Sequence, residues 1–389
     1  MTAWCRLLTA SLLGLTWVLP ASAGESPLSS HLIEAQEVKG DLPAAPTDPA
    51  WAGVPARTFL AYPQRTVRLN DKRANEASKT EGPEPLAVKA VYNARDLAIW
   101  VEWKEETPSK VSRSETNVFG DSVAFEVPIR FGPGLRLPYV GMGDQKLPVR
   151  IAMQRAAEDG TLANEYVAAG FGSLTRTSKP FAKMGMTYDP TTKVWRAEFT
   201  RPLVAGAHSM AQGLVPIAFA VWEGAASQRG GNKRLSSWQF LKLSRYPVSP
   251  AYQRQIAAAV TPAAGSAEKG RQLVTQYCIG CHRFADQQSA QEGFAPDLSS
   301  IGAIATTGYI RESIGQPSEV IVPHLNINRH YDKSAKPDRF RAYPNADGFK
   351  FYVLDDKGHK ASKMPPFSLP KQDLEDIVTY LQTLDGTKE

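Results

Sequence analysis

The sequence predicts a multidomain chain, an all-β antiparallel sandwich followed by a mainly α-helical domain. Short runs that alternate apolar and polar residues, separated by Gly- and Pro-containing loops, fill residues 51–243 and are typical of a sandwich or barrel. A stretch rich in Ala and Pro follows. The last segment then repeats apolar residues at helical spacing. We place the sandwich domain at residues 24–247, the linker at 248–264 and the helical domain at 265–389.

The first 23 residues have the features of a signal peptide. Arg6 is followed by an apolar run from Leu7 to Leu19, which is too short to span a membrane, and Ala21-Ser22-Ala23 is a small-residue cleavage site. We therefore expect export to the periplasm, a mature chain that begins near Gly24, and no transmembrane segment. The formal net charge of +6 is spread along the chain, which argues against a nucleic-acid partner.

The strands of the sandwich are predicted from alternation and turn residues. Leu86–Tyr92 and Leu97–Trp103 flank the turn residues 93–96 and predict a hairpin. Five further runs predict strands at Ser122–Phe131, Val149–Met153, Val194–Phe199, Ile217–Trp222 and Ser237–Leu243. The linker, residues 248–264, has no strand pattern and contains one short helical stretch. The helical domain then opens with Ser266 as a candidate N-cap and ends in a predicted helix at Leu374–Leu384.

The strongest motif is Cys278-Ile279-Gly280-Cys281-His282. Cys-x-x-Cys-His is the attachment signature of haem c, in which two thioether bonds hold the haem and the histidine binds its iron. A thioredoxin-like redox pair, a zinc site and a simple disulfide are the alternatives. Because the third cysteine, Cys5, lies in the signal peptide, no wider disulfide framework is expected.

Residues 265–389 resemble a class I cytochrome c. The resemblance rests on the Cys-x-x-Cys-His helix, on Ala295-Pro296-Asp297-Leu298, and on Met364 in a Met-Pro-Pro loop before the last helix. It implies that Met364 is the sixth iron ligand, that Pro296 supports His282, and that Gly270 lets the first helix approach the last near Tyr380. An insertion at residues 317–363 departs from a minimal cytochrome and contains a predicted hairpin at residues 348–360; it supplies the rival ligands His324, His330 and His359.

Two segments of the sandwich resemble the haem b (gamma) subunits of periplasmic molybdenum enzymes of the dimethyl sulfoxide reductase type. That family includes subunits of ethylbenzene and dimethyl sulfide dehydrogenases, of selenate and chlorate reductases, and of nitrite oxidoreductase. The segments contain Met142-Gly143-Asp144 and Ala220-Val221-Trp222-Glu223-Gly224, the second continuing to residues 233–238. The resemblance implies a non-covalent haem b whose iron is bound by Met142 and Lys233.

The chemistry of these two side chains sets conditions on the site. A lysine binds iron only as the neutral amine, so burial must lower its pKa from about 10.4. If these residues do not bind iron, Met142 would be an ordinary core methionine and Lys233 a solvated loop lysine. His208 is the main rival ligand, because His31 lies near the processed terminus.

The function implied is a periplasmic dihaem electron-transfer subunit without catalytic residues. It would relay electrons between the iron–sulfur subunit of a molybdopterin oxidoreductase and a soluble or membrane redox partner. One alternative is a monohaem cytochrome c with a ligand-binding sandwich, and another is a haem enzyme with an open iron position. The substrate of the partner enzyme and the direction of electron flow are not encoded in this chain.

Overall fold

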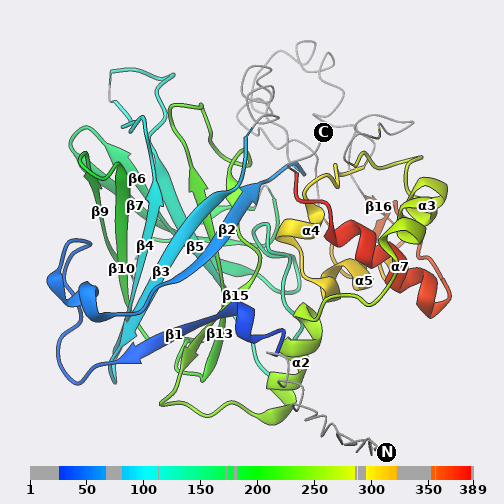
Figure 1. Cartoon of the computed structure of the whole chain (residues 1–389), viewed down its shortest axis with the longest axis horizontal. Helices are drawn as coiled ribbons and strands as arrows, with labels where there is room; N and C mark the ends of the chain where they lie inside the picture. Colours follow the sequence, from blue (N-terminus) through cyan, green and yellow to red (C-terminus); the bar gives the residue numbers. More distant parts are fainter. Residues whose placement is uncertain are drawn as a thin grey trace, which may run out of the picture.

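The described part of the chain contains a β-sandwich and a smaller helical domain, as predicted (Figure 1). The computed structural model describes residues 26–66, 81–112, 114–171, 173–178, 182–284, 287, 295–321, 352–354 and 356–386. The predicted signal peptide, residues 1–23, lies outside the described residues.

Most strands of the sandwich are antiparallel to their neighbours. The paired strands follow the order β8-β7-β6-β5-β13-β14-β2-β3-β4-β10-β9. Strand β1 instead runs parallel to both β15 and β3, and β15 pairs with β13. The bounds are β1 Leu32–Glu37, β2 Arg57–Pro63, β3 Glu84–Tyr92, β4 Asp96–Lys104, β5 Ser122–Pro128, β6 Val149–Ala157, β7 Gly160–Ala168, β8 Thr175–Arg176, β9 Lys183–Asp189, β10 Val194–Pro202, β13 Leu214–Trp222, β14 Arg234–Leu235 and β15 Gln239–Leu243, with a separate pair β11 Val204–Ala205 and β12 His208–Ser209 and the short helices η1 Ser29–His31 and η2 Pro49–Gly53.

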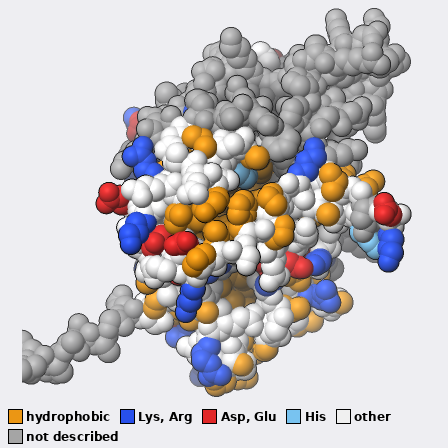
Figure 2. Space-filling model, turned by 90° about the vertical axis from the view of Figure 1, so that its right-hand side faces the viewer, with side chains coloured by type: hydrophobic (Ala, Val, Ile, Leu, Met, Phe, Trp, Pro, Cys, Tyr) orange, Lys and Arg blue, Asp and Glu red, His pale blue; other side chains and the backbone are white. Residues whose placement is uncertain are grey.

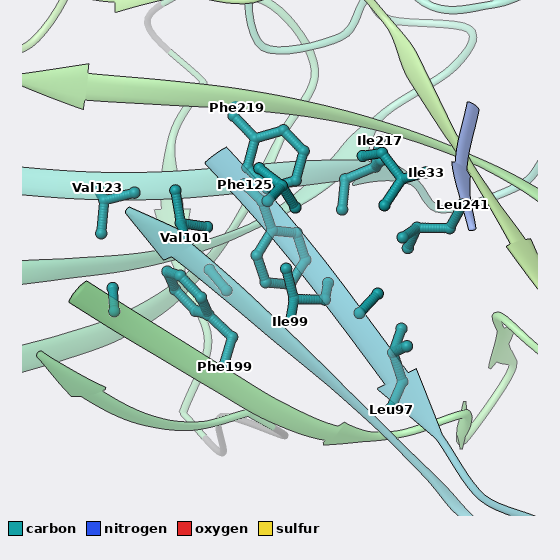
Figure 3. Packing of buried hydrophobic residues seen from close by; sticks show 14 of the residues in the cluster. Ile33, Leu97, Ile99, Val101, Val123, Phe125, Phe199, Ile217, Phe219 and Leu241 are labelled. Atoms are coloured by element: carbon teal, nitrogen blue, oxygen red, sulfur yellow. The ribbon is translucent and has the colours of Figure 1, made fainter. Parts of the chain in front are cut away.

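Aromatic rings join the two layers of the sandwich across its core. Phe125 of β5 meets Phe199 of β10 edge to face, with 5.0 Å between the ring centres. Ile99 and Ile217 belong to the same buried cluster (Figure 3). Because successive side chains of a strand point to opposite faces, the residues that a strand contributes to this core occupy alternate positions. The packed frame holds in place the loops that carry the candidate ligands.

The strands predicted from alternation are present. The predicted hairpin is confirmed as β3 and β4, and the Asn93 side chain closes its turn by accepting hydrogen bonds from the amides of Arg95 and Asp96. The five further runs correspond to β5, β6, β10, β13 and β15. Strands β1, β2, β7 and β9 and the two-residue strands β8, β11, β12 and β14 were not predicted. Most side chains of β7 and β9 are at least partly exposed, so these strands lack a clear apolar alternation.

The predicted linker contains a packed helix, α2 (Pro250–Val260). Its buried residues Tyr252, Ile256 and Val260 join an apolar cluster that includes Trp238 of the sandwich and Ile304 of the helical domain. The two domains therefore share a core through α2, so the linker is an integral part of the fold.

The described part of the C-terminal domain contains α3 Ala267–Tyr277, α4 Ile301–Ile304, α5 Thr307–Gly315, β16 Tyr352–Leu354, β17 Lys360–Ser362 and α7 Lys371–Gln382. The described strands β16 and β17 form the predicted hairpin of the insertion. The Ser266 side chain caps α3 by accepting a hydrogen bond from the Lys269 amide. Figure 2 views the molecule from the right-hand side of Figure 1 and shows apolar side chains grouped near the centre of that face.

Helices α3 and α7 cross at Gly270. A Cβ atom there would lie 1.9 Å from the Asp376 carbonyl oxygen and 2.8 Å from the Tyr380 Cβ, so only glycine permits this approach. The predicted contact of Gly270 near Tyr380 is thereby confirmed. Within the described residues, the helices are too short or too polar to span a bilayer.

Candidate haem centres

The Cys-x-x-Cys-His motif directly follows α3 and faces a cavity of about 240 Å³. Cys278, Cys281 and His282 line this cavity together with Met364. Much of the remaining wall is apolar and includes Leu298, Ile301, Ile310, Ile314, Pro365 and Phe367. The cavity thus combines two thiols, an imidazole and a thioether in an apolar enclosure, which is the set of groups that a covalently attached haem requires.

The orientation of His282 is fixed by the residue predicted to support it. Its Nδ1 donates a hydrogen bond of 2.8 Å to the Pro296 carbonyl oxygen, which leaves Nε2 available for a metal. Burial lowers the pKa of His282 and favours the neutral imidazole, the form that binds iron. The predicted support of His282 by Pro296 is therefore confirmed.

The thiols do not resemble those of a thioredoxin-like redox pair. Reactive thiols in such pairs lie at helix N-termini, where the helix dipole lowers the thiol pKa. Here Cys278 is the C-cap of α3, and burial raises the pKa of its thiol to about 11. Both thiols are free. Among the described residues, no group of three His, Cys, Asp or Glu side chains is arranged to hold a metal ion.

Met364 is held at the cavity by anchors on both sides. Its amide donates a 3.1 Å hydrogen bond to the Ser362 side chain at the end of β17, and the Phe367 amide donates to the Ile314 carbonyl oxygen of α5. The rival His359 is exposed in the turn between β16 and β17. The other two rivals, His324 and His330, lie outside the described residues.

Lys233 lies directly before β14 and is only 5% exposed, so it is not a solvated loop lysine. Its carbonyl oxygen accepts a hydrogen bond from the Gln64 amide, and its Nζ lies 5.4 Å from the centre of the Trp222 ring. Burial lowers the pKa of the Lys233 amine, and the nearby Glu126 carboxylate partly opposes that shift. An amine in this position is brought closer to the neutral form that iron binding needs.

Met142 and Lys233 both lie beside Glu126, a fully enclosed carboxyl group of β5. The carboxyl accepts a hydrogen bond from the Met142 amide and interacts electrostatically with Lys233, while burial raises its pKa. Met142 has a φ of 82°, which costs a non-glycine residue roughly 1–3 kcal/mol and is most common at functional sites. Its side chain packs against the cluster that contains Trp222. The Met142 backbone and the Lys233 side chain thus meet at the same carboxyl group, and the Met142 side chain packs in the neighbouring apolar cluster.

The rival imidazoles of the sandwich, His208 and His31, are engaged in hydrogen bonds with other groups of the protein. Nε2 of His208 donates to the Pro128 carbonyl oxygen, and its Nδ1 accepts a hydrogen bond from the Arg201 guanidinium. Burial and the Arg201 charge lower the pKa of His208 to about 4. Nδ1 of His31 donates to the Trp238 carbonyl oxygen. These contacts make His208 a structural residue.

Two residues at these sites were missed by sequence reasoning. Glu126 could have been singled out as the lone carboxylate in the apolar strand Ser122–Pro128, where every side chain is buried. Tyr139 precedes Met142 by three residues and lines the cavity of the Cys-x-x-Cys-His motif. The sequence around Tyr139 does not indicate a site residue, because Tyr139 reaches the cavity only when the two domains are docked.

Comparisons with known proteins agree with both resemblances. Residues 267–385 match the family model of cytochrome c. A Haloferax mediterranei protein named as a respiratory nitrate reductase heme subunit is 28% identical over 275 residues, covering 70% of this chain and 90% of that protein. The chlorate reductase gamma subunit of Ideonella dechloratans is 29% identical, covering 58% and 90%. The dimethylsulfide dehydrogenase gamma subunit of Rhodovulum sulfidophilum is 27% identical, covering 52% and 76%.

Similarity to solved structures is slight. A family 9 carbohydrate-binding module from Caldicellulosiruptor kristjanssonii aligns over 56% of this chain and 97% of its own, with 11% identity and a TM-score of 0.31. The cytochrome domain of Myriococcum thermophilum cellobiose dehydrogenase aligns over 57% and 99%, with 11% identity and a TM-score of 0.28. These scores are too low to support any inference about function.

Proposed function

We propose that this chain, a homologue of the haem subunits of nitrate and chlorate reductases and dimethylsulfide dehydrogenase, is a dihaem electron-transfer subunit. Haem c would be attached through Cys278 and Cys281, with His282 and Met364 as iron ligands. Haem b would be held without covalent bonds between Met142 and Lys233. The observation that carries the proposal is the buried amine of Lys233, which lies with Met142 beside one enclosed carboxyl group.

Some residues of the chain would bind the cofactors, and others would surround them with apolar side chains. When bound, each haem supplies a site for reversible one-electron transfer. His282 is oriented by Pro296, and the Met364 thioether favours a high reduction potential. The apolar wall of the cavity would keep water from the metal ligands and so further tune the potential. With His282 and Met364 bound to one iron and Met142 and Lys233 to the other, neither iron would offer an open site to a substrate.

The role as a relay implies partners on both sides. We infer that the chain works in the periplasm and exchanges electrons with the iron–sulfur subunit of a molybdopterin oxidoreductase and with a soluble or membrane redox protein. Substrate conversion would take place on the molybdopterin subunit, and this chain would contribute no catalytic residue. The names of the relatives, all haem or gamma subunits, support this division of labour.

Haem content tests the proposal directly. Protein purified from periplasm after maturation with ample haem is assayed by pyridine haemochrome spectra, before and after acid-acetone extraction. We expect equal amounts of extractable haem b and retained haem c. Retained haem c with nothing extractable would leave a monohaem cytochrome with a binding module, and the Met142 and Lys233 assignment would be wrong.

Matched variants test the haem b ligands. Met142→Leu and Lys233→Gln should lose extractable haem b and keep haem c. Met153→Leu is the control for the first, because Met153 packs partly buried against the same cluster. Lys89→Gln is the control for the second, because the Lys89 Nζ also lies over a tryptophan ring, 4.9 Å from the centre of Trp100. Full haem b in both ligand variants would contradict the assignment.

A further inference from the structure

The loop that carries Met142 is organised around one buried carboxylate. Asp144 is 2% exposed, and Arg136 binds both of its oxygens through two hydrogen bonds of 2.9 Å. The same carboxylate accepts hydrogen bonds from the amides of Lys146 and Leu147. Residues 136–147, hereafter the Met142 loop, are therefore held as one rigid unit.

The Met142 loop is fastened to the cytochrome domain by charged side chains. The Arg136 Nε lies 3.6 Å from a carboxylate oxygen of Glu312 in α5, and an Nη of Arg136 donates a 3.3 Å hydrogen bond to the Glu319 carbonyl oxygen. The Lys146 amine pairs with the Glu319 carboxylate at 2.5 Å. These contacts fix the position of the loop relative to the cytochrome domain.

Tyr139 lines the cavity of one candidate haem site and precedes Met142, a candidate ligand of the other, by three residues. It is 3% exposed and lines the cavity of the Cys-x-x-Cys-His motif, which Thr66 also reaches from the sandwich. Its ring centre lies 5.3 Å from that of Tyr309 in α5, and Tyr309 lines the same cavity. The cavity wall on this side is therefore a pair of packed aromatic rings, one from each domain.

A short connection joins Tyr139 to the Met142 site. The Gly143 amide donates a 2.8 Å hydrogen bond to the Tyr139 carbonyl oxygen, so the residue after Met142 is bonded directly to the tyrosine. The charge of Glu126, which accepts the Met142 amide, also acts on the Tyr139 hydroxyl. Tyr139 thus lines the haem c cavity with its ring and is hydrogen-bonded through its backbone to the loop that carries Met142.

We propose that Tyr139, packed on Tyr309, is the bridge through which electrons pass between the haem b and haem c sites. The inference rests on the proposed dihaem function and adds the route within the chain. Electron tunnelling weakens steeply across empty space and less through bonded and packed atoms, so a continuous path through these rings is favoured.

The bridge itself undergoes no chemistry. In each transfer one cofactor loses an electron and the other gains it, and no bond forms or breaks. Burial raises the pKa of Tyr139 to about 12 and raises that of Tyr309, so both hydroxyl groups keep their protons. The two tyrosines would serve only as packed atoms along the path, without a change in their own charge.

The test measures intramolecular electron transfer in the full-length holoprotein. One haem is reduced in a rapid pulse, and absorbance in the b-type and c-type bands follows the equilibration between them. Tyr139→Leu and Tyr309→Leu remove one ring each and should slow equilibration several-fold. Tyr139→Phe keeps the ring and should retain the native rate. Tyr188→Leu removes a ring that packs on Trp195 elsewhere in the sandwich and serves as the control.

Haem content and midpoint potentials of every variant separate a lost bridge from a lost cofactor. Slower equilibration with both haems present and both potentials unchanged supports the bridge. Native rates in both leucine variants with two haems would refute the bridge and leave the dihaem function standing. A leucine variant that loses haem b is set aside, and the other leucine variant decides. A wild-type chain with a single haem would refute the dihaem function and the bridge together.

Discussion

The crossing of α3 and α7 gives a sharp prediction for Gly270→Ala. The new Cβ would meet the Asp376 carbonyl oxygen at 1.9 Å, whereas real Cβ contacts stay beyond 3.0 Å. Because that oxygen belongs to the helix backbone, the two helices must move apart. Such overpacking costs about 1–3 kcal/mol, and separation also weakens the charged hydrogen bond from the Ser266 amide to Asp376, worth about 1.5–3 kcal/mol.

Helix propensity offsets only part of this loss, since alanine is about 1 kcal/mol better than glycine in a helix interior. We expect a net loss of about 3 kcal/mol in the free energy of unfolding of the cytochrome domain. For an ordinary denaturant dependence this lowers the urea midpoint by roughly 1 M.

The assay follows urea unfolding of the holoprotein with two probes. Absorbance of haem c reports on the cytochrome domain. Tryptophan fluorescence reports on the sandwich, because Trp238 is the last tryptophan of the sequence. Gly315→Ala is the matched control, since a Cβ there meets nothing within 4 Å. An unchanged haem c midpoint in Gly270→Ala, or an equal loss in both variants, would refute the reasoning.

Two further predictions concern single side chains. The pKa of His208 is about 4 in the folded protein and 6.5 in the unfolded chain, so between these values only the unfolded chain takes up the proton. Stability is therefore lost as pH falls from 6.5 to 4, by about 3 kcal/mol, and His208→Gln should flatten this pH dependence in urea unfolding; equal slopes for the two proteins would contradict it. Met364→Leu should lower the reduction potential of haem c in a spectroscopic redox titration, because the thioether ligand is lost, whereas His359→Gln should not. The opposite pattern would make His359 the ligand.

The sequence predicted those features that depend on neighbouring residues. The Cys-x-x-Cys-His motif needs only adjacent residues, and the β3–β4 hairpin needs only two alternating runs and a turn. Strand β7 was missed because only two of its nine side chains are buried, so its sequence lacks a clear apolar alternation. Its place in the sheet comes from pairing with β6 along its whole length.

Features that depend on distant contacts could not be predicted. Glu126 is a candidate site residue only because the fold brings the Met142 loop and Lys233 to its carboxyl group. Tyr139 reaches the haem c cavity only because the domains dock through Arg136 and Glu312. The resemblance supplied Met142 and Lys233, but it had no means of placing them relative to the cytochrome domain.

The shared core around α2 has a consequence for the speed of electron relay. Many multidomain redox proteins must swing one domain toward another before electrons can cross, and solvent friction then limits their rate. Here Ile304 of the cytochrome domain is packed in the same cluster as Trp238 of the sandwich and Ile256 of α2. No swing of that kind is compatible with this packing. The rate of electron transfer within the chain should therefore be unchanged when glycerol or sucrose raises the viscosity of the solvent.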